Sequence, residues 1–273
     1  MSIGRSSAAK RLAQSSIRAC SQLFATPATE VLLSGTAAYI NAICGLGWSP
    51  SLELEARNAA AWIARGREYA VIDAGANVGD WTSLFRKHTA DRKGTIYALE
   101  PQPAAAARIR ALHLECCEVL ELALGEHPGR ATFHSGGPLD TTGSLFERRD
   151  TYGGGRTFNS FEVEVVRIDD LVQQRGIEQI DFLKMDLEGA EHQALKGAAQ
   201  CLSSRRIRAL SFEFGTSNVN ARVFFRELYN LLADGGFDIF RVTPAGRLIP
   251  VSAYTEDYEC FARTTTYFAR LRQ

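Results

Sequence analysis

Three carboxylates follow one short apolar stretch of the chain. Residues 180–185 read Ile-Asp-Phe-Leu-Lys-Met, and Asp186, Glu188 and Glu191 come directly after them. The apolar stretch is typical of a strand buried inside a parallel sheet. A carboxylate at the carboxyl end of such a strand needs donors, a cation or a ligand to offset its desolvation. Ligands of open α/β sheets bind at these strand ends, so the cluster predicts a functional site.

Acid–base chemistry is the first role that these residue types suggest. Asp186 and Glu213 end neighbouring predicted strands, and this pair is our leading candidate for taking the proton of a reacting hydroxyl. Glu188 is the next catalytic candidate, whereas Glu191 is also placed to cap the helix that follows. Lys184 lies two residues before Asp186 and therefore on the same face of the strand. We expect it either to orient catalytic groups or to form a structural ion pair.

The same acids could hold a metal ion. A divalent cation bound by Asp186 and Glu213 would lower the pKa of an acceptor hydroxyl and orient it. Carboxylate oxygens suit magnesium, and no His-rich ligand spacing for zinc accompanies them. The sequence therefore allows a magnesium ion without requiring one, and it argues against zinc.

A glycine-rich turn earlier in the chain is a candidate cofactor loop. A short apolar strand leads into Asp73, and Gly75, Asn77 and Gly79 then precede a helix expected over 80–88. Glycine lets the backbone turn sharply and come close to a ligand. The start of the helix offers free amide donors. The pattern predicts the binding site of a cofactor that contains a nucleoside.

Acidic residues around this turn narrow the choice of cofactor. Glu100 follows a second predicted strand, 95–99, where a carboxylate can accept hydrogen bonds from both hydroxyls of a ribose. The carboxylate of Asp73 repels a pyrophosphate but attracts the ammonium and sulfonium groups of S-adenosylmethionine. Asn77 also replaces the glycine that admits pyrophosphate in dinucleotide-binding loops. These residues favour S-adenosylmethionine over a dinucleotide.

Five segments of the chain, taken in order, resemble the FkbM family of methyltransferases. They are 73–79, 99–101, 123–125, 167–171 and 182–191. The likeness runs from about residue 53 to the carboxyl terminus and is most specific over 184–191. It implies a Rossmann-like class I methyltransferase fold, with a doubly wound, mostly parallel sheet of seven strands, one of them antiparallel. It also implies S-adenosylmethionine as methyl donor and a small-molecule acceptor, usually a hydroxyl on a sugar or secondary metabolite.

The resulting hypothesis is an S-adenosylmethionine-dependent O-methyltransferase. Its cofactor-binding residues are predicted to be Asp73, Gly75, Asn77, Gly79 and Glu100. The acceptor side is predicted to use Asp186, Glu213, Glu188 and Lys184. A nicotinamide-dependent oxidoreductase is the alternative enzyme, but it needs room for pyrophosphate beside Asn77, and the chain has no Tyr-x-x-x-Lys pair. A non-catalytic protein that keeps the cofactor fold is the third interpretation, and the presence of both acidic sets disfavours it.

The composition is that of a globular protein with one main domain. The 273 residues are 45% hydrophobic, which is enough for a substantial core. Lys and Arg together number 31, as do Asp and Glu, so a nucleic-acid partner is not expected and a membrane partner is disfavoured. The six cysteines show no Cys-x-x-Cys spacing, and we expect them to be reduced in a cytoplasmic protein.

Residues 1–52 are expected to form a helical extension ahead of a methyltransferase domain over 53–273. The first part of the extension combines basic residues with apolar positions at helical spacing. This pattern predicts an amphipathic helix that caps the domain or joins two copies in a homodimer. Residues 31–52 contain no charged residue, but their Ser, Gly, Asn and Pro residues argue against a membrane span. A secretory signal is not expected.

Alternating helix and strand signals fill the rest of the chain, as a doubly wound sheet requires. Helices are expected over 54–65, 103–114, 190–202 and 223–233, and strands over 117–122, 180–185, 207–214, 237–242 and 259–265. The resemblance to the FkbM family implies that the last strand is antiparallel and lies at or near an edge of the sheet.

An irregular stretch, 126–160, separates the two halves of this pattern. A loop of this length is either a lid over the acceptor or a surface insertion. Residues 132–134 and 161–168 are expected to pair beside it as a small β extension.

Overall fold

The computed structural model describes residues 7–148 and 157–272 of the chain. The chain divides into two compact units, one up to Ala42 and one from Ile43 onward, and each is described by itself. The first unit is formed by the helices α1 (Ser7–Phe24) and α2 (Pro27–Ile43), and α1 is the helix expected near the amino terminus. No helix in the described residues is both long enough and apolar enough to cross a membrane. The expected domain boundary, 52–53, lies at the start of α3 and stays a prediction.

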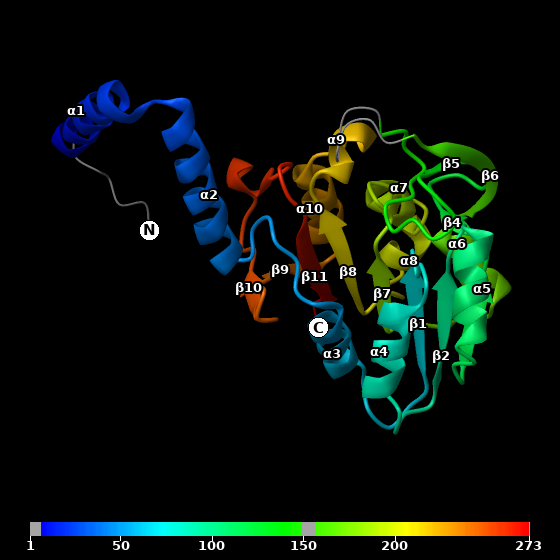
Figure 1. The fold of residues 1–273 in the computed structure, drawn as a ribbon. Coiled ribbons are helices and arrows are strands. Elements are labelled where there is room, and N and C mark those ends of the chain that lie inside the picture. Colours follow the sequence, from blue (N-terminus) through cyan, green and yellow to red (C-terminus); the bar gives the residue numbers. More distant parts are fainter. Residues whose placement is uncertain (1–6, 149–156, 273) are drawn as a thin grey trace. The chain divides into compact units, whose positions relative to one another are not determined.

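The second unit is built on an eight-stranded sheet (Figure 1). The strand order is β10-β9-β11-β8-β7-β1-β2-β3. The bounds are β1 (Tyr69–Ala74), β2 (Gly94–Leu99), β3 (Cys117–Leu120), β7 (Phe182–Met185), β8 (Ala209–Phe214), β9 (Phe237–Val242), β10 (Leu248–Pro250) and β11 (Thr265–Leu271). β1 pairs in parallel with both β2 and β7, and the chain winds outward from β1 in both directions. This confirms the doubly wound, mostly parallel, Rossmann-like fold predicted from the sequence.

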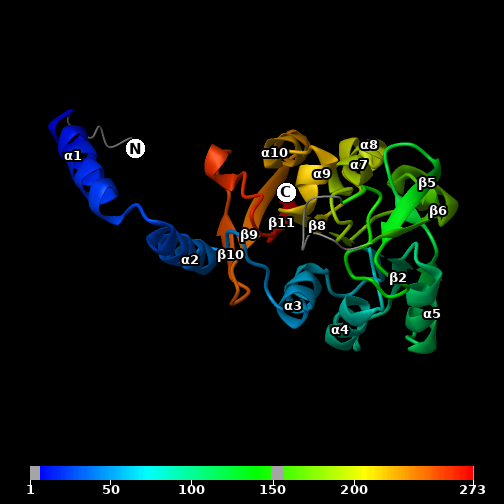
Figure 2. The same cartoon turned by 45° about the horizontal axis from the view of Figure 1, so that its top comes forward.

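Helices cover both faces of this sheet (Figure 2). Their bounds are α3 (Leu52–Trp62), α4 (Asp80–His88), α5 (Pro103–Ala111), α6 (Ile168–Gln174), α7 (Glu191–Lys196), α8 (Ala199–Ser203), α9 (Ser217–Ala221) and α10 (Phe225–Asp234). Successive residues of a strand point to opposite faces, so Val71 packs with α3 and α4 whereas Ile72 packs with α6, α7, α8 and α10. Trp81 of α4 stacks on Phe182 of β7, which fixes this helix beside the strand that leads to the acidic stretch.

The far edge of the sheet differs from expectation in two ways. The sheet has eight strands rather than seven because β10 pairs antiparallel with β9 and extends the edge. The last strand begins at Thr265 and lies inside the sheet, antiparallel to both β8 and β9. The expected strand over 259–265 was therefore placed too early. The carboxylate of Glu259 instead accepts the amides of Phe225 and Arg226 and caps the start of α10.

Two helices, α7 and α8, replace the single helix expected over 190–202. The break falls at Gly197, whose backbone packs so closely on the carbonyl oxygen of Gly125 that a Cβ atom would overlap it. The carboxylate of Asp169 then accepts the amides of Gln200 and Cys201 and starts the second helix. A tertiary contact thus interrupts a continuous helical pattern.

A second sheet of three strands forms the β extension. It contains β4 (Ala123–Leu124), β5 (Gly129–Ser135) and β6 (Asn159–Val166). β5 and β6 pair with each other, as predicted, and the structure shows that they run antiparallel, with Phe133 opposite Phe161. Residues 149–156, part of the stretch expected to be either a lid or a surface insertion, lie outside the described residues.

Candidate active site

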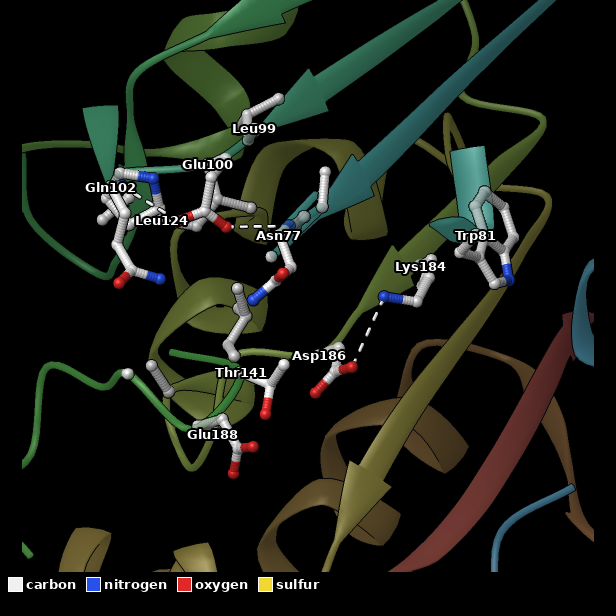
Figure 3. A pocket seen from close by; sticks show the side chains of 18 of the residues that line it. Asn77, Trp81, Leu99, Glu100, Gln102, Leu124, Thr141, Lys184, Asp186 and Glu188 are labelled. Carbon is white, nitrogen blue, oxygen red and sulfur yellow. Dashed lines mark hydrogen bonds and ion pairs between the residues drawn. The ribbon is translucent and has the colours of Figure 1, made fainter. Parts of the chain in front are cut away.

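A cavity of about 230 Å³ lies at the carboxyl ends of β1, β2 and β7 (Figure 3). Its walls come from the turns after these strands and from the segment 140–145 between β5 and β6. Of the residues predicted for the site, those that line the cavity are Gly75, Asn77, Glu100, Lys184, Asp186 and Glu188. Asp73, Gly79 and Glu213 lie outside this lining. The structure thus brings the glycine-rich turn and the acidic stretch to one space.

Backbone contacts fix the turn after β1. The amides of Gly75 and Ala76 both donate to the carbonyl oxygen of Leu99, each at 3.0 Å. Gly75 has a φ of +77°, and a Cβ atom there would overlap the carbonyl oxygen of Asp186. Gly79 has a φ of +87° and directly precedes α4. Position 75 requires glycine, because both its φ angle and its close contact exclude a side chain.

Glu100 holds the same turn from the end of β2. Its carboxylate oxygens accept the amides of Asn77 at 2.8 Å and Gln102 at 2.9 Å. Burial raises the pKa of Glu100, and the hydrogen bonds from these amides oppose the rise. Asn77 adopts a left-handed φ of +49°, and its Oδ1 is buried without a hydrogen-bond partner in the described part of the chain. Glu100 therefore shapes the turn and also places an acid on the cavity wall.

Asp140 closes the cavity from the segment between β5 and β6. Its carbonyl oxygen accepts hydrogen bonds from Nδ2 of Asn77 at 3.2 Å and from Nε2 of Gln102 at 3.0 Å. Ser135, at the end of β5, donates to Oε1 of the same Gln102 at 2.8 Å. The described part of the expected lid therefore contacts the glycine-rich turn directly. Opening and closing of this segment stay a prediction.

Lys184 lies in the middle of a buried group of charges. Its Nζ is 3.3 Å from Oδ1 of Asp73 and 3.6 Å from Oδ2 of Asp186. Thr82 of α4 donates a 2.5 Å hydrogen bond to the other carboxylate oxygen of Asp73, which is fully buried. Asp73 is thus held by protein groups beneath the turn. The sequence placed it beside the cofactor, whereas its contacts are with Lys184 and Thr82.

Glu55 of α3 belongs to the same group of charges. It is buried and accepts a 2.9 Å hydrogen bond from Oγ of Ser211. Burial raises the pKa of Glu55 to about 7, and the Lys184 ammonium and the Ser211 hydroxyl oppose the rise. Burial acts to lower the pKa of Lys184, but the surrounding carboxylates raise this pKa by more than burial lowers it. The lysine therefore stays charged. We call this set the lysine cluster: Lys184, Asp73, Asp186, Glu55 and Glu213.

Asp186 and Glu213 stand at the carboxyl ends of neighbouring strands but in different surroundings. Asp186 lines the cavity, and 36% of its side chain is exposed. Glu213 accepts hydrogen bonds from Ser49 at 3.2 Å and from Thr266 at 3.4 Å. Burial, followed by the negative charge of Asp186, raises the pKa of Glu213 well above its usual value. The two acids predicted as a pair therefore act on each other through their charges, while only one of them faces the cavity.

Glu188 is paired with Arg148, from the segment between β5 and β6. Nη2 of Arg148 lies 2.5 Å from Oε2 of Glu188, and the side chain of Arg148 is 4% exposed. Oγ of Ser144 also donates to the carbonyl oxygen of Glu188 at 2.8 Å. Burial and then the charge of Asp186 raise the pKa of Glu188 to about 7, whereas Arg148 opposes the rise. This ion pair ties the segment to the acidic wall of the cavity.

Glu191 is the first residue of α7, and its carboxylate holds the turn before this helix rather than capping the amides of its first turn. Its two carboxylate oxygens accept the amides of Leu187 at 2.8 Å and Gly189 at 3.0 Å. Burial raises the pKa of Glu191 to about 8, although hydrogen bonds from its own amide and from the amide of Leu187 favour the charged form. Glu191 therefore shapes the turn that carries Glu188.

Within residues 7–148 and 157–272, no group of three or more His, Cys, Asp or Glu side chains is arranged to hold a metal ion. Asp186 and Glu213, the pair predicted for magnesium, lie in the different surroundings described above. Magnesium binding stays a prediction.

Glu55, Gln102 and Arg148 are among the residues of the site that were not predicted. Glu55 lies within a predicted helix, where one acid among several has no distinctive pattern. Gln102 comes two residues after Glu100, and this closeness was the available signal. Arg148 belongs to an irregular stretch, where no periodicity indicates which way a side chain points.

The strand order, the acid-held turn after β1 and the acidic stretch after β7 together define a class I methyltransferase domain. Glu100 and Asp186 meet at one cavity in that topology. The chain belongs to the FkbM family: the model of the methyltransferase FkbM domain matches residues 73–239, which is more than half of the chain.

Two relatives have names that describe a reaction. The 2-O-methyltransferase NoeI of Sinorhizobium fredii is 31% identical over 147 residues, which cover 50% of this chain and 60% of NoeI. The 31-O-demethyl-FK506 methyltransferase FkbM of Streptomyces tacrolimicus is 28% identical over 221 residues, which cover 71% of this chain and 80% of that protein. The match to NoeI thus spans less than two thirds of its length.

A solved structure of the methyltransferase FkbM from Methylobacillus flagellatus KT is also similar to this chain. The match has a TM-score of 0.46 at 16% identity and covers 88% of this chain and 60% of the other. The family assignment depends on the family model, which matches the sequence from the glycine-rich turn to β9.

Proposed function

We propose that the protein is an S-adenosylmethionine-dependent O-methyltransferase whose acceptor is a hydroxyl of a small molecule, such as a sugar or a secondary metabolite. One observation carries the proposal: a single cavity is lined both by the turn that Glu100 holds and by Asp186 and Glu188. Methyl transfer requires the donor carbon and the acceptor oxygen to be held in line, and one shared cavity provides that space. The names of the two relatives support oxygen as the acceptor atom.

The residues present fit the methyl donor. When bound, S-adenosylmethionine supplies a methyl group on a sulfonium centre. The carboxylate of Glu100 is suited to the two hydroxyls of a ribose, and Oδ1 of Asn77 is an acceptor without a protein partner in the described residues. Leu99, Leu124 and Phe133 give the cavity an apolar wall suited to an adenine ring. An acidic and apolar lining is also poorly suited to the pyrophosphate of a nicotinamide cofactor.

We assign indirect roles to two of the predicted cofactor residues. Asp73 orients Lys184 through their 3.3 Å ion pair and anchors α4 through Thr82. Gly79 directly precedes α4 and has no side chain with which to cap the amides of the first turn of this helix. Both residues would act on the methyl donor by shaping the turn and helix that bind it.

Asp186 is our candidate for the proton acceptor. The acceptor hydroxyl would lose its proton to the Asp186 carboxylate while its oxygen forms the bond to the methyl carbon, and the bond from that carbon to the donor sulfur would break with its electron pair left on a neutral thioether. Lys184 orients that carboxylate through their 3.6 Å ion pair. Glu188 lies on the same wall and is suited to hydrogen-bond a second hydroxyl of the acceptor. Glu213 lies outside the cavity lining. It would therefore act through its electrostatic interaction with Asp186 and not by contact with the acceptor.

A two-part experiment tests this function. Calorimetric titration should show saturable binding of S-adenosylmethionine and of its demethylated product, with no binding of NAD. Hydroxylated sugars and metabolites are then screened with a labelled methyl donor, and the label is located on the product. Asp186→Asn should keep cofactor binding and lose at least about a hundredfold in transfer rate.

A matched exposed substitution, Asp257→Asn, serves as the control and should leave both measurements unchanged. Binding of NAD in place of the methyl donor, or unchanged transfer by Asp186→Asn, would refute the proposal. Addition of a chelator tests magnesium separately, since an unchanged rate removes the metal from the mechanism.

A further inference from the structure

The balanced total charge of the chain conceals a basic amino-terminal unit. Residues 1–42 contain four basic residues, Arg5, Lys10, Arg11 and Arg18, and a single acid, Glu30. Because the whole chain has 31 basic and 31 acidic residues, the remainder carries three more acids than bases. The zero net charge was the reason for not expecting an anionic membrane as partner. It is the sum of a basic amino-terminal part and an acidic remainder.

The sequence of α1 separates into two faces. With about 100° between successive residues, its basic and amide positions fall within one arc of about 140°. These positions are Lys10, Arg11, Gln14, Arg18 and Gln22. The remaining arc holds Leu12, Ile17, Leu23 and Phe24 among small residues. Ile17 is 66% exposed and Phe24 is 57% exposed, so these two apolar side chains are not covered in the first unit.

The sequence of α2 continues this apolar character. None of its residues is buried, and Glu30 is its only charged residue. Leu32, Tyr39 and Ile43 fall within an arc of about 40°, with Ile40 and Leu33 beside them. All five side chains are more than half exposed. Large contiguous apolar surface of this kind marks a binding surface.

We propose that α1 and α2 form a docking surface for a lipid bilayer that contains anionic headgroups. The basic face of α1 matches anionic headgroups, and the apolar residues of both helices match the boundary of the acyl chains. A helix with this division of residues lies in the plane of the interface. The inference goes beyond the proposed methyl transfer and does not depend on it.

Two other occupants fit the observations less well. A second copy of this chain, paired through α1, would bring basic residues together without an acid of α1 to balance them. A nucleic acid would match the basic face, but it would leave the apolar residues of α2 in water. A bilayer satisfies both the charge and the apolar surface.

Sedimentation of the full-length protein with lipid vesicles tests this proposal. Vesicles of phosphatidylcholine with one quarter phosphatidylglycerol should bind the protein, and high salt should weaken the binding. Reversal of three charges in Lys10→Glu/Arg11→Glu/Arg18→Glu should lower the affinity by roughly a hundredfold. The control Arg57→Glu/Arg65→Glu/Arg108→Glu changes the net charge equally at exposed positions of the second unit and should bind as the wild type does.

An apolar variant completes the test. Leu32→Ser/Tyr39→Ser/Ile43→Ser should lower the affinity for the same vesicles at least tenfold, with circular dichroism confirming that the fold is retained. Equal binding by the two charge-reversed variants would overturn the proposal, as would failure of the wild type to bind anionic vesicles. A dimer in solution that the apolar variant dissociates, without any vesicle binding, would assign the surface to a second copy instead.

Discussion

The carbonyl oxygen of Asp186 occupies the space into which a side chain on Gly75 would extend. The same two turns are also joined by a 3.0 Å hydrogen bond from the amide of Asp186 to the carbonyl oxygen of Ala74. The turn that we assign to the methyl donor and the residue that we assign to the acceptor therefore share one backbone junction. Close-packed backbone transmits displacement, so a shift of the backbone at either residue moves the other.

Gly75→Ala should disrupt the contact between the turn after β1 and the backbone of Asp186. The new Cβ atom would overlap the Asp186 carbonyl oxygen, and alanine disfavours a φ of +77°. We expect loss of measurable cofactor binding and a fall in the free energy of unfolding of more than about 3 kcal/mol. Urea denaturation and calorimetric titration measure the two effects.

Gly66→Ala provides the matched control. Gly66 has a similar φ of +84°, but no atom lies within 4 Å of the position that a Cβ atom would take there. Gly66→Ala should lower the free energy of unfolding by about 1–2 kcal/mol, because of the φ angle alone, and should leave cofactor binding intact. Equal losses in the two variants would show that the contact with Asp186 does not matter.

Replacement of Lys184 should destabilise the protein strongly. In Lys184→Met the carboxylates of Asp73 and Asp186 lose a cation that lies within 4 Å of both. Removal of one partner from a buried ion pair costs about 3–5 kcal/mol, because the remaining charge is left without compensation. Urea denaturation at neutral pH measures the loss.

The exposed Lys196, paired with Glu126 at 3.2 Å, offers a comparison of the same residue type. Lys196→Met should change the free energy of unfolding by less than about 1 kcal/mol. Equal free energies of unfolding for Lys184→Met and Lys196→Met would contradict the inference that the lysine cluster stabilises the fold.

Glu55 should make stability fall as the pH rises. Its pKa in the folded state is about 7, above the usual 4.5, so the folded protein holds this proton more tightly than the unfolded chain does. Its contribution to stability is full below about pH 4.5, decreases as the pH rises and is lost above about pH 7. Glu55→Gln removes this titration. As the pH rises from about 4.5 to 7, the free energy of unfolding of the variant should therefore increase relative to that of the wild type by up to about 3 kcal/mol.

Urea denaturation at several pH values between 5 and 8 checks this dependence. Glu68→Gln, at an exposed position, should follow the wild type in parallel. A wild type and a Glu55→Gln variant that run parallel over the whole range would contradict the buried, protonated state of Glu55.

The parts of the site that sequence reasoning located are those governed by strand ends. Gly75, Glu100 and Asp186 each follow a recognisable apolar strand, and parallel strands bring their carboxyl ends to one edge. The sequence could not show which acids face the cavity, because that depends on side-chain packing. Asp73 and Glu213 therefore turned out to contact Thr82 and Thr266 rather than the cavity.

The errors in the fold have a common physical origin. The helix over 190–202 is interrupted because Gly197 meets Gly125, which is far away in the sequence. The last strand begins late because Glu259 caps α10. Local periodicity reports the preference of a segment, whereas contacts of this kind decide where an element ends.

The ion pair between Arg148 and Glu188 should govern acceptor binding. It connects the segment between β5 and β6 to a residue of the cavity wall, and its Arg148 side chain is almost fully buried. A double-mutant cycle of Arg148→Met and Glu188→Gln should give a coupling energy of about 1–3 kcal/mol in the free energy of unfolding. The pair of Arg175 and Glu118 lies 2.8 Å apart with 31% and 43% of its two side chains exposed, and it should give less than about 1 kcal/mol.

Kinetics separate a role in the site from a purely structural one. Arg148→Met should raise the KM for the acceptor at least about tenfold and leave the affinity for S-adenosylmethionine unchanged, because Arg148 contacts Glu188 and not the turn after β1. Loss of Arg148 also removes the charge that opposes the raised pKa of Glu188, so that pKa should rise above about 7. If the acceptor binds to ionised Glu188, the pH below which KM increases must then move upward in the variant. An unchanged pH profile together with an unchanged KM would leave the ion pair a structural link only.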